Sequence, residues 1–440
     1  MINIYNYLNN VFLKVKNQTT NNTFEFLLTL VLITIPLHYR YNSSSVILLT
    51  AFSIYKAKEN KFKIQSQLLF PVALYLLMLL SLLWTIDFDL TFQALLKEIT
   101  LVLLPFSFFI NPISREAKNR ILIIYAYSIF VFSIGVLVIA TYRFFITQDS
   151  SVFFYHELVT KDVNAIHVSC YCTIAFFCFL IKSKKTILDK FAIVLLLVMI
   201  FLLSSKNIIV VFFILLFLFM FFNKKKTFKK VYFYVGFISL SLILLLFFNK
   251  IKERFEIEIK SNVTNNSINE AISSKGLVYN VSIYDAWNQE KFSGNDYFPG
   301  TALRVYQIRI FKELLLEENI FFNGYGLNAS WKKITQKRIE HNLHEGYESF
   351  NFHNQYIQNF AELGVVGFIL LVIMVCLTLK KAIKNKDFIH FSFAILMISL
   401  FLTESFLWRQ RGVVFFITMY CLFNSKTIIN NLIKEKPKTT

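Results

Sequence analysis

The sequence predicts an all-α, polytopic membrane protein: a bundle of about twelve transmembrane helices with one large external loop. Three observations favour this class. The 440-residue chain is 56% hydrophobic and only 17% charged, whereas soluble domains contain about 25% charged residues. Apolar runs of helical length recur along most of the chain. These runs do not alternate polar and apolar residues, which excludes an outer-membrane β-barrel.

Twelve apolar runs are candidates for the helices, since a span needs about 20 mainly apolar residues. In chain order they are 24–38, 43–55, 68–84, 92–110, 121–144, 164–181, 188–205, 207–222, 230–249, 355–379, 387–404 and 411–424. The second and last are short for a span. The runs predict an N-terminal membrane region at 1–249, an external loop at 250–352 and a C-terminal membrane region at 353–440.

Positive charge alternates between the connections that join these runs. One set of connections holds 26 Lys and Arg residues, and the short connections of the other set hold 7. Cytoplasmic connections carry the excess of Lys and Arg, so the pattern predicts that both termini are cytoplasmic and that loop 250–352 is external. The net charge of +19 therefore indicates topology, and we expect no nucleic-acid partner.

Cysteine and histidine spacing predicts neither a disulfide framework nor a metal centre. All five cysteines lie in apolar runs, where they are ordinary buried residues. His341 and His344 precede His353 in the same polar stretch, but no carboxylate or Cys spacing beside them matches a familiar metal signature. We expect no metal and no cofactor. The chain also has no apparent cleavable signal peptide, since no small-residue cleavage site follows the first apolar run.

The second half of the external loop contains a predicted amphipathic helix. From Arg304 to Glu317 a helical period puts apolar residues on one stripe. They are Leu303, Ile308, Phe311, Leu314 and Leu315. We expect this helix to lie on the outer face of the bundle.

The chain re-enters the membrane at a His-Asn pair that heads a glycine-containing helix. On a 3.6-residue period His353, Tyr356, Phe360, Gly364 and Gly367 share one broad face. The imidazole is then predicted at the water–lipid boundary, at the mouth of the bundle. A boundary histidine by itself is more often structural, but this is also a position for a base that acts on a membrane-held substrate.

Three more residues are predicted at the same boundary. Lys206 lies in a tight turn between two runs, Arg304 begins the amphipathic helix, and His167 opens the run 164–181. Each has a plain structural alternative: a snorkelling lysine, a solvated arginine and a capping histidine. Together with His353 they indicate a reaction on an anionic, lipid-held donor. Cations would stabilise a diphosphate leaving group, and a neutral histidine would take a proton from a hydroxyl.

At this point the chain resembles the O-antigen ligase / O-antigen polymerase superfamily of bacterial membrane glycosyltransferases. Three segments within about 190–380 carry the resemblance. They are His353-Asn354 followed by Gly364-Val365-Val366-Gly367, Arg304 followed by Asn323-Gly324-Tyr325-Gly326-Leu327-Asn328, and Leu203-Ser204-Ser205-Lys206. His167 is similar to a His-x-x-Tyr-like element of some relatives.

The resemblance implies transfer of a glycan from undecaprenyl diphosphate to an acceptor hydroxyl, such as that of lipid A-core, without a metal. It implies an inner-membrane protein whose active site faces the periplasm, in lipopolysaccharide or polysaccharide biosynthesis. Catalytic roles fall on His353, Arg304 and Lys206. The implied substrate-binding residues are Asn354, Tyr356, His167, Gly324, Gly326, Gly364 and Gly367. Lys206 departs from the arginine that is usual in the family, and loses the bidentate fork of a guanidinium.

Other functions stay open. A polymerase that joins repeat units on the same carrier, or a protein O-oligosaccharyltransferase, would use the same donor. A flippase or exporter of the lipid-linked glycan is the non-enzyme alternative. That alternative predicts charged residues at mid-membrane and, in many transporters, internal repeats. Most of the apolar runs have no such charges, and no repeat is evident.

Overall fold

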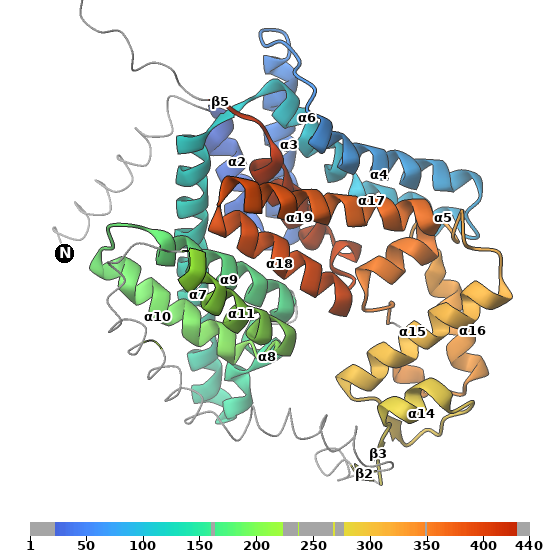
Figure 1. The fold of residues 1–440 in the computed structure, drawn as a ribbon. Coiled ribbons are helices and arrows are strands. Elements are labelled where there is room, and N and C mark those ends of the chain that lie inside the picture. The colour runs from blue at the N-terminus through green and yellow to red at the C-terminus, as the bar shows by residue number, and fades with distance from the viewer. Residues whose placement is uncertain are drawn as a thin grey trace, which may run out of the picture.

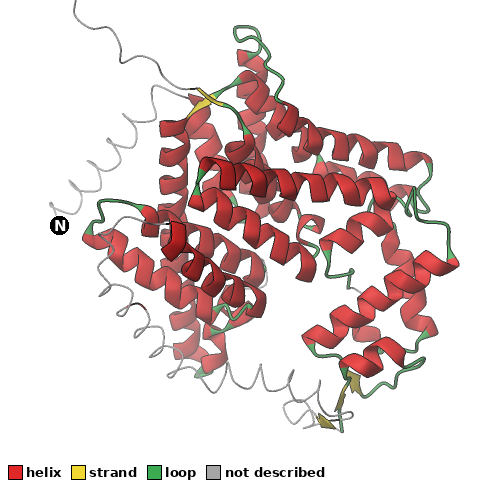
Figure 2. Ribbon diagram, viewed as in Figure 1, coloured by secondary structure: helices red, strands yellow, loops and turns green. Residues whose placement is uncertain are grey.

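The computed structural model describes residues 23–159, 163–222, 236, 267–268, 277–347 and 350–428. Helices dominate this part of the chain, and the strands are two residues long (Figure 2). Four of the described helical segments are long and apolar enough to cross a membrane, and further apolar helices are shorter. The predicted class, an all-α polytopic membrane protein, is confirmed. The number of spans stays a prediction.

The N-terminal membrane region folds as helices joined by short turns (Figure 1). They are α2 (Thr23–Thr34), α3 (Tyr39–Lys56), α4 (Leu69–Leu80) between the 3-10 turns η1 (Ser66–Leu68) and η2 (Ser81–Leu83), α5 (Phe88–Glu98), α6 (Thr100–Ile110), α7 (Arg115–Thr147), η3 (Ser150–Phe153), α8 (Tyr155–Val159), α9 (Ala165–Ile181), α10 (Ile187–Leu202) and α11 (Lys206–Phe222). Eight predicted runs coincide with these helices, and run 230–249 lies outside the described residues except for Gly236.

The C-terminal membrane helices occupy the centre of the bundle. They are α17 (Gln355–Asn385), α18 (Phe388–Thr403) and α19 (Gln410–Asn424), with the 3-10 turn η6 (Phe406–Trp408) before α19. Every residue of α19 from Gly412 to Asn424 is buried, as is nearly all of α9. Both helices are therefore enclosed by other parts of the protein. By contrast α3, α4 and α7 expose many large apolar side chains, as expected where helices face lipid.

The described part of the loop that is predicted to be external forms a small unit beside the bundle, with a core of its own (Figure 1). Its helices are α14 (Ile283–Asn288), α15 (Gly300–Glu317) and α16 (Ser330–Glu340), followed by η5 (Glu345–Tyr347). Strand β3 (Tyr279–Asn280) pairs antiparallel with β2 (Ser267–Ile268) and parallel with β4 (Asp296–Tyr297). A second pair joins β1 (Ile113–Ser114) in parallel to β5 (Thr427–Ile428), with Ile113 opposite Thr427.

The predicted stripe on α15 is partly wrong. The residues that α15 buries are Ala302, Tyr306, Gln307, Ile310 and Leu314, whereas Ile308 is exposed. The reason is that α15 packs mainly into the core of the loop unit, where Tyr306 stacks edge-on against Phe292. An expectation of one membrane-facing stripe could not anticipate this second core. Phe311 does face α17, through its ring contact with Phe360.

The predicted common face of the His353 helix is also wrong, because α17 does not contain His353. Asn354 caps the helix by accepting a hydrogen bond from the Ile357 N–H at 3.1 Å, and His353 precedes the cap. Gly364 then breaks the helical dihedrals with φ 68° and ψ −169°. A 3.6-residue period therefore does not run from His353 to Gly367.

Gly364, where the helix breaks, packs against the segment that contains Gly324 and Gly326. A Cβ on Gly364 would lie 2.0 Å from the Phe322 carbonyl oxygen, and one on Gly324 would lie 2.4 Å from the Glu362 carbonyl carbon. Both residues have positive φ, which glycine adopts without strain. Backbone hydrogen bonds from the Gly326 N–H to the Glu362 carbonyl, at 2.9 Å, and from the Val365 N–H to the Phe321 carbonyl, at 2.8 Å, lock the two segments together.

Candidate functional site

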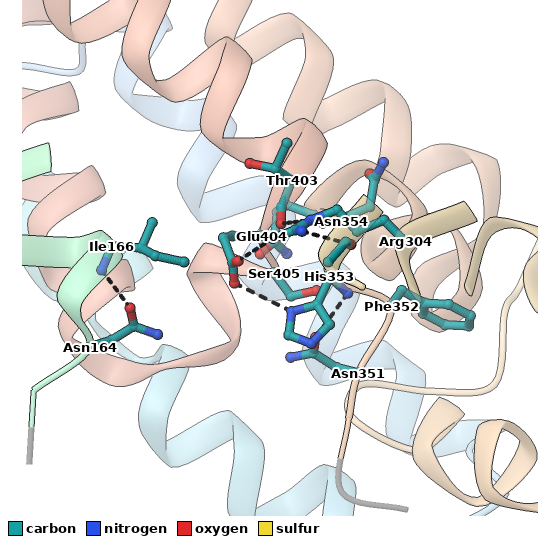
Figure 3. Close-up of polar contacts among 12 residues, drawn as sticks. Asn164, Ile166, Arg304, Asn351, Phe352, His353, Asn354, Thr403, Glu404 and Ser405 are labelled. Atoms are coloured by element: carbon teal, nitrogen blue, oxygen red, sulfur yellow. Dashed lines mark hydrogen bonds and ion pairs between the residues drawn. The ribbon is translucent and has the colours of Figure 1, made fainter. Parts of the chain in front are cut away.

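Three side chains from separate segments meet beyond the C-terminal end of α18 (Figure 3). Arg304 of α15 donates from Nη2 to Glu404 Oε1 at 2.9 Å. His353 Nδ1 lies 3.4 Å from the other oxygen of the same carboxylate. Glu404 thus bridges a guanidinium and an imidazole. We call these three residues the His353 cluster.

The backbone around His353 is held in an unusual conformation. His353 has φ 46°, in the left-handed region that non-glycine residues seldom adopt. Its N–H donates to Asn351 Oδ1 at 2.9 Å, and the Asn354 side-chain amide donates to the Leu402 carbonyl at 3.2 Å. These bonds fix the chain on both sides of His353. Such strain persists only where the surroundings impose it, and it gathers at functional sites.

Arg304 is anchored by three partners. Its Nε donates to the Thr403 carbonyl at 2.8 Å, its Nη1 to the Gly300 carbonyl at 2.9 Å, and its Nη2 to Glu404. A guanidinium has five N–H donors, so these bonds leave one on each terminal nitrogen. N–H donors on the two terminal nitrogens are the groups with which a guanidinium binds the oxygens of a phosphate.

Glu404 lies just beyond α18 and carries the negative charge of the cluster. Burial would raise the pKa of its carboxyl, but the hydrogen bond with His353 and the nearby charges of His353 and Arg304 outweigh that effect. The pKa of Glu404 is therefore below its ordinary value of 4.5. An ionised Glu404 can orient the imidazole through Nδ1–H, which would leave Nε2 as the acceptor nitrogen.

The turn that carries Lys206 is tied to the same region. Helix α10 ends at Leu202 and α11 begins at Lys206, so the predicted tight turn is confirmed. The neighbouring Asn207 side chain donates to the Ser399 carbonyl at 3.0 Å and to Thr403 Oγ1 at 2.6 Å. Thr403 in turn accepts from Arg304 through its carbonyl. Lys206 itself is half-buried at the start of α11.

His167 reaches the neighbourhood from α9 but is enclosed. Its ring centroid lies 4.2 Å from that of Phe406, two residues after Glu404, and 6.4 Å from that of Tyr171. Only 4% of the residue is exposed. Figure 3 shows the start of α9, where Asn164 caps Ile166, facing the loop of Glu404. His167 is therefore buried against Phe406, next to the loop that carries Glu404.

The remaining predicted binding residues have structural contacts of their own. The Tyr356 hydroxyl donates to the Ile398 carbonyl at 3.3 Å and holds α17 to α18. Gly324 and Gly364 form the interlock described above, and Gly326 sits against Thr85. A Cβ on Gly367 would lie 2.4 Å from the Leu363 Cβ. A substrate-binding role for these glycines stays a prediction.

The other histidines of the loop belong to different surroundings. His341 Nδ1 is 2.9 Å from the Tyr306 hydroxyl, and its Nε2 is 3.3 Å from Glu313. Burial lowers the pKa of His341, so it stays neutral at pH 7 in the core of the loop unit. His344 Nδ1 accepts from the Gly346 N–H at 3.1 Å.

Glu404 was not among the predicted site residues. Its sequence signal is present, since it is an acidic residue at the end of an apolar run on the side assigned to Lys206 and His353. An acidic residue at such a boundary is common, and only its two partners set it apart.

The fold and this cluster define a polytopic membrane protein in which an arginine, a histidine and a carboxylate meet at the ends of the helices. Residues 191–372 match the family model described as O-antigen ligase. The matched segment covers less than half of the chain and is similar to the O-antigen ligase and polymerase superfamily, as the motifs predicted. The family indicates glycosyltransferase activity of the ligase or polymerase type, in a membrane, on lipid-linked glycan. No curated protein matches the chain.

Proposed function

We propose that the protein is a membrane glycosyltransferase of the O-antigen ligase type. It transfers a glycan from undecaprenyl diphosphate to an acceptor hydroxyl, such as that of lipid A-core, at the external face of the inner membrane. Both termini are then cytoplasmic and the His353 cluster faces the periplasm. The observation that carries the proposal is the meeting of Arg304, His353 and Glu404 at helix ends within and beside the family-matching segment.

In this mechanism His353 Nε2 takes the proton of the acceptor hydroxyl while Glu404 holds Nδ1–H. The hydroxyl oxygen attacks the anomeric carbon, and the bond from that carbon to the diphosphate oxygen breaks. The electron pair of that bond leaves with the diphosphate. Arg304 stabilises the growing negative charge through its two remaining N–H donors, and Lys206 adds a second positive charge. The proton on His353 then passes to solvent or to the departing diphosphate.

The test is transfer by purified protein in liposomes, with a lipid-linked oligosaccharide as donor and lipid A-core as acceptor. We expect His353→Ala to lower the rate by about 10²–10⁴-fold, with unchanged protein level and Tm. Wild-type transfer by that variant would refute the role of His353. His344→Ala, which changes an exposed histidine of the loop unit, is the matched control and should transfer at the wild-type rate.

A deletion strain separates ligase from polymerase. Loss of all lipid A-linked polymer, with accumulation of carrier-linked polymer, supports the ligase. A surface glycan capped at a single repeat unit supports the polymerase instead. Normal glycan with accumulation of unglycosylated protein supports a protein O-oligosaccharyltransferase. Turnover of the donor by reconstituted protein without an energy source excludes the flippase.

A further inference from the structure

A small cavity lies beside the His353 cluster, between α5, α17, η6 and the segment 327–328. Its volume is about 20 Å³, which is enough for one water-sized occupant. Two carboxylates line it, Glu98 of α5 and Glu362 of α17. The side-chain amides of Asn328, Gln355, Gln358 and Asn359 complete the polar part of the lining. We call it the carboxylate cavity.

Both carboxylates are buried and lack a directly paired cation. Glu98 is 6% exposed and Glu362 is 3% exposed. Within the described part of the chain, neither forms an ion pair. Glu98 Oε2 has no hydrogen-bond partner at all, and Lys97, which also lines the cavity, keeps its side chain exposed.

Glu362 accepts two side-chain hydrogen bonds on one of its oxygens. Its Oε1 accepts from Gln358 Nε2 at 2.5 Å and from Ser330 Oγ at 3.3 Å. Donors converge on Glu362, while Glu98 faces the cavity with an unused oxygen. An isolated charge in such a place is costly unless it is paired or coordinates a metal ion. Lys97 is part of the lining, but it forms no ion pair with either acid.

We propose that Glu98 and Glu362 bind one Ca²⁺ ion in this cavity. Two carboxylates match a divalent charge. Ca²⁺ takes six to eight oxygen ligands in flexible geometry from carboxylates and side-chain amides, whereas Mg²⁺ retains several waters, for which about one water volume leaves no room. Asn328 Oδ1 and Asn359 Oδ1 accept one hydrogen bond each, from Trp408 Nε1 and Gln355 Nε2, and each oxygen has a second lone pair.

This site is of a different kind from the histidine-based centre that the spacing excluded. In the described ranges, no group of three or more His, Cys, Asp or Glu side chains is arranged to hold a metal ion. Amide oxygens of Asn359, on α17, and of Asn328, on one further segment, supply what a third carboxylate would. The ion would join α5, α17 and the loop after Gly326, and its role is structural. The proposal does not depend on the proposed transferase function.

The cavity has a direct connection to the His353 cluster through Gln358. Its Nε2 donates to Glu362, and its Oε1 accepts from the Phe352 N–H and from Ser405 Oγ, each at 3.3 Å. Phe352 precedes His353 and Ser405 follows Glu404. An ion that fixes Glu362 would therefore also fix the backbone next to both residues.

The experiment is Ca²⁺ binding by the full chain in detergent after treatment with EGTA. Titration calorimetry should show one Ca²⁺ bound per chain, and saturating Ca²⁺ should raise the Tm by roughly 3 °C or more. Mg²⁺ at the same concentration should do neither. Glu98→Gln and Glu362→Gln should each abolish both effects. Glu59→Gln, at an exposed carboxylate paired with Lys56, should keep them.

Each other outcome overturns the proposal. No uptake of Ca²⁺ by the wild-type chain at millimolar concentration refutes the site whether or not the variants fold. Uptake that survives both substitutions places the ion elsewhere. A third outcome is that Ca²⁺ has no effect on the wild-type chain, but its Tm rises as the pH falls from 8 to 5. If Glu98→Gln removes that rise, the two acids share a proton instead of binding an ion.

Discussion

The His353 cluster and the carboxylate cavity both bury acidic side chains, but they differ in what faces those acids. Glu404 has a guanidinium on one oxygen and an imidazole on the other. Glu98 and Glu362 line a cavity together with side-chain amides, and neither forms an ion pair with Lys97 of the same lining. All three carboxylates are largely buried, so the difference shows that the role of a buried carboxylate depends on the charged groups and hydrogen-bond donors that contact it. Glu404 is equipped to orient a base, and the cavity pair is equipped to receive an ion.

Of the substitutions that test this comparison, a change at Arg304 should have the largest effect on transfer. Arg304→Lys keeps the charge and loses the fork, so the bonds to Thr403 and Glu404 and the two outward donors cannot all be kept. We expect kcat/KM for transfer to fall by about 10²-fold. Lys206→Arg, the matched change in the opposite direction, should alter it by less than about threefold. Equal activity of both variants and the wild type would contradict a phosphate-binding fork at Arg304.

Removing the negative charge of the cluster should separate binding from chemistry. In Glu404→Gln the imidazole loses the carboxylate that orients it, and Arg304 loses the anion that competes with diphosphate. We therefore expect kcat to fall by about 30-fold while KM for the lipid-linked donor also falls. Steady-state kinetics in liposomes measure both. A rise in KM with unchanged kcat would mean that Glu404 contacts substrate and does not position His353.

Cutting the connection between the two regions should have a smaller effect. Gln358→Leu removes the bonds to Phe352, Ser405 and Glu362 but leaves all three residues of the cluster in place. We expect transfer to fall by about tenfold, with Ca²⁺ still bound. Gln336→Leu, which loses only an exposed pair with Glu340, serves as the control. Loss of Ca²⁺ binding in Gln358→Leu would show that the amide belongs to the ion site.

The smallest effect is the pH dependence of stability from Glu404. Its pKa is lowered in the folded protein, so its contribution is present above its ordinary value of 4.5 and is lost as the pH falls through the lower folded value. The Tm difference between wild type and Glu404→Gln should be present at pH 5 and shrink below about pH 4.5. A difference that does not shrink below about pH 4.5 would contradict an ionised Glu404.

Much of the fold and part of the site follow from the sequence, because those features are local. Apolar runs predict buried or lipid-facing helices. In a membrane no water can bond the backbone N–H and C=O groups, and a helix satisfies them within one segment. The Gly-x-Gly at 324–326 and the Gly-x-x-Gly at 364–367 predict a close backbone approach. His353, Arg304 and Lys206 stand out by type at the boundaries of the runs.

The tertiary structure decided the rest, because those features depend on which distant segments meet. The break at Gly364 exists because Phe322 occupies the space beside it, so the 3.6-residue period failed there. The partnership of Glu404 with Arg304 and His353 joins residues 100 and 51 positions apart, and Glu98 and Glu362 line one cavity from two different helices. Composition and periodicity describe one segment at a time, and only packing brings such segments together.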